Sequence, residues 1–253
     1  MPHTFDLSAL RVPATADLCF VHVCDSHCTD GASTRIVADA VAAINEVSPE
    51  FVVFGGDLAD EGRPESYAAL KRALSGLQSP AHFVPGNHDL ADEKRSFTSC
   101  LGPLNQAFDV GPYHCICLDS TGPTQLTWGG MFTGAAIAWL EDHLRTVPAD
   151  KPVILFTHHG IRSEQPHAPL ENLLWDVLNY KPIHAALAPQ NLILTCAGHA
   201  HENVVQQWGG TTMIWSGVLS SVRANHVALP PGFRVVWLEG GKVSTTWIAA
   251  TPV

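Results

Sequence analysis

Hydrophobic residues occur along most of the chain either in short continuous runs or at intervals of three and four positions. The short runs are typical of strands buried on both faces, and the spaced positions are typical of amphipathic helices. The pattern predicts strands at residues 18–24, 51–56, 81–84, 113–118, 153–157 and 192–196, and helices at 33–47, 65–77 and 135–147. Ser33 or Thr34 is the expected N-cap of the first helix.

From residue 204 onward the helical spacing disappears. Strand-like runs follow one another, joined by glycine pairs such as Gly209-Gly210, and we expect strands at residues 204–208, 211–215, 233–238 and 243–248. Strand–helix units followed by strands alone predict a layered α/β fold, with sheet packed on sheet and helices outside. No repeat or linker interrupts the chain, so we expect a single domain over residues 1–253.

Residues 160–189 have the least regular pattern, with five prolines and glycines among polar and aromatic residues. A segment of this kind is typical of a loop or lid over a site. Trp128, Phe132 and Trp175 are candidates for a pocket that binds a nucleobase, although aromatic residues in loops more often pack beneath their own loop.

The composition argues against several classes of protein. The net charge of −10 does not suit a binder of long nucleic acids, which needs a basic face. No apolar run approaches the ~20 residues that span a bilayer, and residues 1–17 lack the basic and apolar regions of a secretory signal. Several of the seven cysteines lie within apolar runs, which fits reduced thiols in a cytoplasmic protein.

Chemistry-bearing residues follow five of the predicted strands, at the point where each strand ends. They are Asp25 and His27, Asp57 and Asp60, Asn87 and His88, His158 and His159, and His199 and His201. Sites of open α/β sheets form at the carboxyl ends of strands. Imidazole, carboxylate and amide groups suit Zn, Mn, Fe, Co or Ni. A shared carboxylate can bridge two such ions in a site for phosphoester displacement.

These segments read D-x-H, G-D-x-x-D, G-N-H-D, H and G-H-x-H, in that order, over residues 25–201. In this the chain resembles the calcineurin-like metallophosphoesterase superfamily. The segment GGDLADEGRPESYAALKRALSGLQSPAHFVPGNHD is similar to the class III cyclic-nucleotide phosphodiesterases within it. The resemblance implies a four-layer αββα sandwich of two packed mixed sheets, and two divalent transition-metal ions (Mn, Fe, Zn or Co) as cofactors.

The resemblance also implies a role for each of these side chains. One ion would be held by Asp25, His27 and His201, the other by Asn87, His158 and His199, with Asp57 bridging the two. His88 would not bind metal but would stabilise the transition state or protonate the leaving oxygen, and Asp60 would orient it. Whether His158 or its neighbour His159 is the ligand stays open, with His158 preferred.

The implied activity is hydrolysis of a small phosphodiester, such as a 3',5'-cyclic nucleotide, by attack of a metal-bound hydroxide. Glu61 stands where phosphoprotein phosphatases of the superfamily place a phosphate-binding Arg, which disfavours a monoester dianion. The alternatives are a phosphomonoesterase or a glycerophosphodiesterase on the same centre, and a scaffold without activity is disfavoured because no ligand is missing. Relatives are often dimers, so a homodimer stays open, whereas we expect no membrane partner and no nucleic-acid polymer.

Overall fold

Helices are interspersed among the strands as far as residue 187, and in the described residues strands alone follow. The structure is a computed structural model that describes residues 2–29, 31–123, 129–161, 176–220 and 230–253. Its helices are α1 (Ala32–Val47), α2 (Pro64–Ala73), α3 (Arg95–Leu101), α4 (Gly134–Leu144) and α5 (Lys181–Leu187). Its strands are β1 (His3–Phe5), β2 (Leu18–Val23), β3 (Phe51–Gly55), β4 (Ala81–Val84), β5 (Gln106–Val110), β6 (Tyr113–Cys117), β7 (Pro152–Phe156), β8 (Asn191–Ala197), β9 (Val204–Trp208), β10 (Thr211–Trp215), β11 (Gly232–Glu239) and β12 (Lys242–Pro252).

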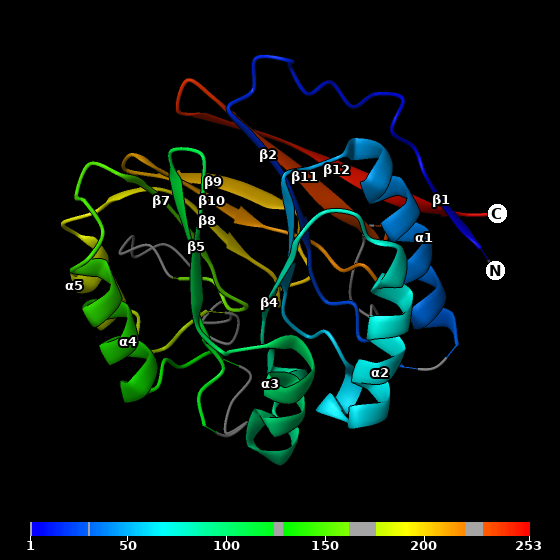
Figure 1. Ribbon diagram of the computed structural model, residues 1–253, viewed down its shortest axis with the longest axis horizontal. Helices are drawn as coiled ribbons and strands as arrows, with labels where there is room; N and C mark the ends of the chain where they lie inside the picture. The colour runs from blue at the N-terminus through cyan, green and yellow to red at the C-terminus, as the bar shows by residue number, and fades with distance from the viewer. Residues whose placement is uncertain (1, 30, 124–128, 162–175, 221–229) are drawn as a thin grey trace.

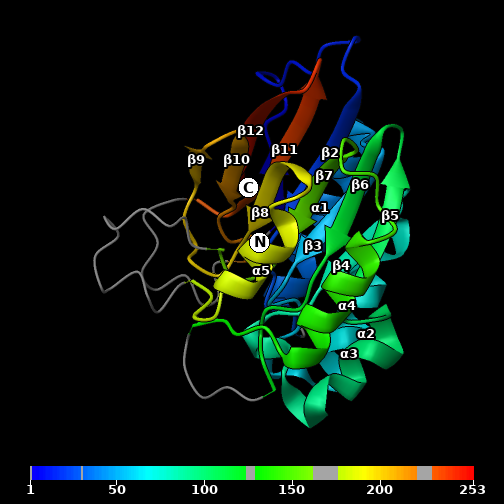
Figure 2. The same cartoon turned by 90° about the vertical axis from the view of Figure 1, so that its left-hand side faces the viewer.

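The strands form two six-stranded sheets that pack against each other. The first sheet has the order β1-β12-β11-β2-β3-β4 and the second the order β5-β6-β7-β8-β10-β9. Helices α1, α2 and α3 cover the outer face of the first sheet, and α4 and α5 lie on the far side of the second (Figures 1 and 2). The predicted four-layer αββα sandwich is therefore confirmed.

Each sheet mixes parallel and antiparallel pairs. In the first sheet β2, β3 and β4 are parallel, and in the second sheet β6, β7, β8 and β10 are parallel. Strands β11 and β12 run antiparallel to their neighbours. Because parallel strands end at the same edge, the loops after β2, β3 and β4 are brought together, and so are the loops after β7 and β8.

Three apolar layers hold the sandwich together. Strand β2 is buried along its whole length and alternates between two of them: Val21 faces the helices of the first sheet, and Phe20 faces the second sheet. The Phe20 ring stacks on Phe51 at 5.0 Å and meets the edge of Phe156 at 5.4 Å, which joins the sheets through an aromatic cluster. A third layer lies between the second sheet and helices α4 and α5.

The structure corrects several expectations about the elements. Helix α1 is preceded by Gly31 without a side-chain cap, and Ser33 lies within the helix, where its Oγ accepts the N–H of Thr29 at 2.9 Å. The helix predicted at 65–77 ends at Ala73 and continues as a 3-10 turn. Elements β1, β5, α3 and α5 were not predicted: β1 and the two helices are too short to show a period, and the polar residues Gln106 and Asp109 leave β5 without a continuous apolar run.

Part of the predicted lid is regular structure. Helix α5 occupies the end of the 160–189 span, and Ile183 and Leu187 anchor it in the apolar layer beneath. Residues 162–175 of that span lie outside the described residues. Among the described residues, no helix combines the length and the apolar composition that crossing a bilayer requires.

Candidate metal centre

The ends of five strands from both sheets deliver polar side chains to one place. Strand β2 leads to Asp25 and His27, β3 to Asp57 and Asp60, β4 to Asn87 and His88, β7 to His158, and β8 to His199 and His201. Apart from Asp60 and Asn87, these residues form overlapping groups of three whose candidate ligand atoms lie within 4.8 Å of one another, and Asn87 Oδ1 lies 3.1 Å from His158 Nε2. The structure therefore brings the side chains of the sequence motifs together at the edge of the sandwich where the parallel strands of both sheets end.

The loops after β2 and β3 are fastened to each other by their backbones. The N–H of Asp25 donates to the carbonyl of Gly56 at 3.0 Å, and the N–H of His27 donates to that of Asp57 at 2.8 Å. Gly56 has φ +98°, and a Cβ there would lie 2.2 Å from the ring of His158. Only glycine allows this approach, so the second G of the GGD segment is required by packing.

Asp89 ties the loop after β4 to the loop after β3. Its carboxylate accepts the N–H groups of Leu58 (3.1 Å), Ala59 (3.1 Å) and Gly86 (2.8 Å), and the hydroxyl of Tyr67 (2.8 Å). Burial and the nearby charge of Asp57 raise the pKa of Asp89 to about 6, which still leaves it ionised at neutral pH. The four donors therefore face an anion, and the acid that ends the G-N-H-D motif is a structural latch.

One cluster is formed by Asp25, His27 and His201. The Nε2 of His201 lies 3.2 Å from an oxygen of Asp25, and the other oxygen of Asp25 accepts the N–H of His199 at 3.1 Å. Burial opposes the charge of Asp25, but His201 outweighs it and lowers the pKa of this carboxyl. The pair is thus a carboxylate beside an imidazole, both of which are metal-ligand types.

A second cluster is centred on Asp57. The Nδ1 of His158 donates to the carbonyl of Gly55 at 2.9 Å, so its Nε2 faces Asn87 Oδ1 at 3.1 Å and Asp57 Oδ1 at 3.3 Å. Burial opposes protonation of His158, but Asp57 outweighs it and raises the pKa to about 9. Burial and the charge of His158 lower the pKa of His199 to about 4, so its imidazole is neutral.

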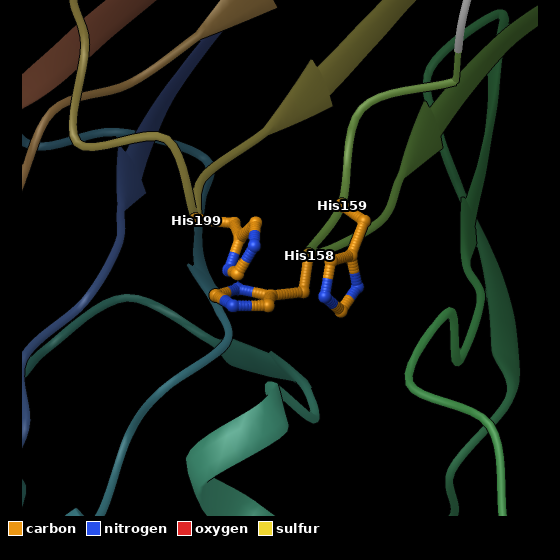
Figure 3. A group of neighbouring side chains, drawn as sticks. All are labelled: His158, His159 and His199. Carbon is orange, nitrogen blue, oxygen red and sulfur yellow. The ribbon is translucent and has the colours of Figure 1, made fainter. Parts of the chain in front are cut away.

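His159 also lies in this cluster. Figure 3 shows His158 and His159 following β7, with the His199 ring from the end of β8 beside them, and a nitrogen of each ring lies within 4.8 Å of the others. The Nδ1 of His159 lies 3.1 Å from the hydroxyl of Ser120, which also accepts the His159 N–H at 3.0 Å. His158, in contrast, faces Asp57 and Asn87, which favours it as the ligand. The choice between the two stays a prediction.

His88 lies at the rim of the centre. Its side chain is 15% exposed, its Nδ1 is 3.5 Å from Asp60 Oδ1, and its Nε2 is 3.9 Å from Asp57 Oδ2. The same oxygen of Asp60 is 3.7 Å from His27 Nδ1, so this carboxylate stands between two rings. These are ion-pair distances rather than close hydrogen bonds, and the orienting role of Asp60 stays a prediction.

The arrangement fits divalent cations. The His27 ring is 1% exposed, and neither of its nitrogens has a hydrogen-bond partner among the described residues, although Nε2 points to Asp57 Oδ2 at 3.8 Å. A buried polar ring without partners is costly unless something else binds it. The clustered donors are imidazoles and carboxylates, with the amide oxygen of Asn87 beside His158, a set that suits Zn, Mn, Fe or Co.

Several residues outside the motifs complete the surroundings of the centre. His22 Nδ1 lies 2.8 Å from the hydroxyl of Ser216, and burial together with the charge of Arg234 lowers its pKa to about 3, so it is a neutral core residue. Sequence reasoning missed Ser120 and Arg234, for which no local motif exists. Phe132 is buried beneath α4 rather than lining a pocket, which corrects that hypothesis. Trp128 and Trp175 lie outside the described residues.

Comparisons with known proteins agree with this geometry. The family model for calcineurin-like phosphoesterases matches residues 19–203. The chain is 30% identical to a glycerophosphodiester phosphodiesterase of Enterobacter lignolyticus over 70% of its own length, and it spans only 65% of that relative. It is also 30% identical to a Rhodopseudomonas palustris protein named a probable cyclic nucleotide phosphodiesterase, over 81% of this chain and 80% of the relative.

A solved structure extends the comparison to the fold. A dimetal phosphatase from Danio rerio superposes with a TM-score of 0.68 at 16% identity, covering 93% of this chain and 98% of that one. At this identity the likeness concerns the fold alone, and it spans both sheets of the sandwich.

Proposed function

The chain belongs to the calcineurin-like phosphoesterases, and from this premise we propose that it is a phosphodiesterase dependent on two divalent transition-metal ions, with a small diester such as a 3',5'-cyclic nucleotide as substrate. The observation that carries the proposal is the convergence of Asp25, Asp57 and His158, whose ligand atoms all lie within 4.8 Å of one another. Each of these three residues also belongs to a second group of candidate ligands: Asp25 with His27 and His201, Asp57 with His27 and His88, and His158 with His159 and His199.

Two sets of side chains would hold the ions. Asp25, His27 and His201 form one set, Asn87, His158 and His199 the other, and Asp57 lies between them. When bound, two divalent cations supply water of lowered pKa as nucleophile and neutralise the charge on phosphate oxygens. The residues of the chain then have to position the diester and deliver a proton to its leaving oxygen.

His88 is the residue that we assign to the leaving group. It is adjacent to Asn87 but lies at the rim, and its Nδ1 is 3.5 Å from the carboxylate of Asp60, so its Nε2 is the nitrogen on the side of Asp57. An alkoxide leaving group needs a proton in the transition state, because it is a strong base. Asp60 would act by holding the ring in place.

The charges near the centre favour a diester over a monoester. Glu61 follows Asp60 directly, is half exposed and forms an ion pair with Arg63, so a carboxylate with its own cation occupies this part of the rim. A monoester dianion gains from additional cationic donors, whereas a diester carries a single charge. A glycerophosphodiester is the second candidate, because the Enterobacter lignolyticus relative is named for that substrate.

We also propose that the protein acts in the cytoplasm. All seven cysteines are free, and all except the half-buried Cys100 are buried. Burial raises the pKa of Cys24 well above the ordinary thiol value, which keeps this thiol unreactive. Unpaired buried thiols are usual in a reducing compartment.

Metal analysis followed by a panel of esters tests the proposal. Protein loaded with Mn²⁺ is expected to hold two ions per chain and to hydrolyse bis-p-nitrophenyl phosphate, a cyclic nucleotide or glycerophosphodiester better than the matching monoesters, compared by kcat/KM under one metal condition. Asp57→Asn removes the carboxylate that lies between the two sets of ligands, and it serves as the comparison protein with an impaired centre. One ion per chain after reconstitution would overturn the two-ion centre, and a monoester preference would identify a phosphomonoesterase instead.

A further inference from the structure

Arg234 is a buried cation in the interface between the two sheets. It lies on β11, opposite His22 of β2 in the register of the first sheet, and is 4% exposed. Among the described residues no carboxylate lies within ion-pair distance of it, and its Nε has no hydrogen-bond partner. Its partners are neutral: Asn203 Oδ1 at 2.7 Å, Trp215 O at 3.4 Å and Thr245 Oγ1 at 3.2 Å.

A buried guanidinium without a carboxylate is costly for the fold, because its lost hydration is only partly replaced. Here the guanidinium lies 5.8 Å from the centre of the Trp247 ring, and the residue opposite Arg234 on β2 is the buried His22. An aliphatic residue would fill this position with less desolvation. The presence of Arg234 at this position therefore has to be explained by the contacts that its guanidinium makes.

Two of those contacts reach across to the second sheet. Asn203 directly precedes β9, and Trp215 ends β10, whereas Arg234 belongs to the first sheet. The Oδ1 of Asn203 also accepts the N–H of Gly217 at 3.2 Å, so this single oxygen is held by two donors. Arg234 thus fastens the segment that leaves the G-H-x-H motif to the opposite sheet.

That segment carries a metal-ligand candidate. Asn203 is two residues after His201, and His201 Nε2 lies 3.2 Å from Asp25. Asp25 itself follows β2, the strand that pairs with Arg234 through His22. The Arg234–Asn203 bond therefore links the segment that carries His201 to the sheet whose strand β2 leads to Asp25.

We propose that Arg234 is a positioning residue for the Asp25–His27–His201 half of the centre and that it acts through Asn203. The inference rests on the two-ion centre of the proposed function. Bonds behind a ligand that fix its orientation typically contribute ~10–100-fold to metal affinity. In the other half, His158 is fastened by different contacts, to the carbonyl of Gly55 and to Asn87, and only His199 shares the segment that this bond holds, so we expect that half to depend on the bond much less.

Isothermal titration of Mn²⁺ into chelated protein tests the inference through affinity rather than activity. The titration is expected to show two binding steps, one for each ion. His201→Ala first identifies which step belongs to the ion held by Asp25, His27 and His201. Arg234→Gln and Asn203→Ala are each expected to weaken that step by ~10–100-fold and to leave the other step within about twofold. The double variant is expected to be no weaker than the single ones, because both remove the same bond.

Thr245→Val is the matched control. It removes another neutral partner of Arg234, but Thr245 lies on β12 of the same sheet, so both Mn²⁺ steps are expected to stay within about twofold of the wild type. Asn203→Ala keeps the inference testable if Arg234→Gln does not fold.

Three results would overturn the inference. Unchanged affinity of both steps in Asn203→Ala would exclude a role for this bond. If the variants weaken Mn²⁺ binding equally at both steps and also lower the Tm, Arg234 stabilises the contact between the sheets in general and does not position one half of the centre. Fewer than two steps in the wild-type protein would overturn the two-ion centre itself, and this outcome is seen before any variant is measured.

Discussion

Five of the seven candidate ligands hold a backbone conformation that non-glycine residues rarely adopt. Asp25, His27, Asp57, His199 and His201 have φ between +39° and +63°. Each residue in such a conformation lowers the stability of the fold by about 1–3 kcal/mol, so the surrounding contacts have to hold the backbone in place. The bonds between neighbouring loops and the latch at Asp89 provide these contacts. The strain is concentrated at the strand ends where the sequence motifs lie.

Replacement of His88 separates proton transfer from metal binding. His88→Ala is expected to keep both ions, because the other seven side chains supply the ligands, and to lose activity by ~10²–10⁴-fold on a diester with an alkoxide leaving group. A nitrophenyl diester needs little protonation and should lose much less. The measurement is kcat on both substrates, together with metal content.

Asp60→Asn is the companion variant, since Asp60 lies 3.5 Å from His88. It should show the same substrate-dependent loss in milder form. If His88→Ala slows both substrates by the same factor, His88 binds the phosphate rather than the leaving oxygen. Loss of metal from this variant would instead make His88 a ligand.

Asp89 offers a prediction about stability. Asp89→Asn replaces an oxygen that accepts two hydrogen bonds by an NH₂ group that faces donors, which leaves buried groups unsatisfied. We expect a loss of about 2–3 kcal/mol in the free energy of unfolding, measured by urea denaturation. Asp92→Asn, on an exposed carboxylate in the following turn, is the control. A change of less than 0.5 kcal/mol in Asp89→Asn, a size typical of neutral surface substitutions, would contradict the latch.

At the scale of elements, the strands that carry the site are those that the sequence predicts best. Strands β2 and β3 are buried runs and β4 is a partly buried apolar run, all with motifs at their ends, and the observed bounds of β2 and β3 differ from the predicted ones by one residue. Helix α5 is too short to show a period, and edge strand β5 is only partly buried and lacks a continuous apolar run. The latch at Asp89 and the Arg234–Asn203 bond join residues 31 positions apart, a separation at which no local pattern operates.

The contact between α4 and β6 is expected to depend on pH. His143 of α4 stacks on Trp139 and lies 2.9 Å from His114 Nε2, while His114 Nδ1 is 2.6 Å from Asp109, which also pairs with Lys151. Burial and the neighbouring His114 lower the pKa of His143. The folded protein therefore binds this proton less well than the unfolded chain does.

Stability from His143 is present above the ordinary histidine pKa of ~6.5 and is lost as the pH falls through that value. The urea midpoint of the wild-type protein should consequently decline more between pH 7.5 and 5.5 than that of His143→Gln, which cannot titrate. Parallel declines in the two proteins would show that this contact is insensitive to protonation.

At the scale of the whole molecule, the candidate centre joins the two halves of the sandwich. Asp25, His27, Asp57 and Asn87 follow strands of the first sheet, and the three remaining ligands follow strands of the second. The sheets also meet through apolar side chains and through polar bonds such as those of His22, Arg234 and Gln106. Ions bound between the sheets would therefore stabilise the entire fold rather than one loop.

Thermal unfolding tests this consequence. A ligand at 100 times its Kd stabilises the folded state by ~2.7 kcal/mol, and ~1 kcal/mol raises the Tm of a chain of this size by ~2–4 °C. Chelated protein is thus expected to gain roughly 5–10 °C per bound ion on addition of Mn²⁺, in one cooperative transition, because both sheets share the ligands. Asp57→Asn should gain much less, since the carboxylate between the two sets is lost. An equal gain in this variant, or a second transition that leaves one sheet unaffected, would show that the ions do not bind between the sheets.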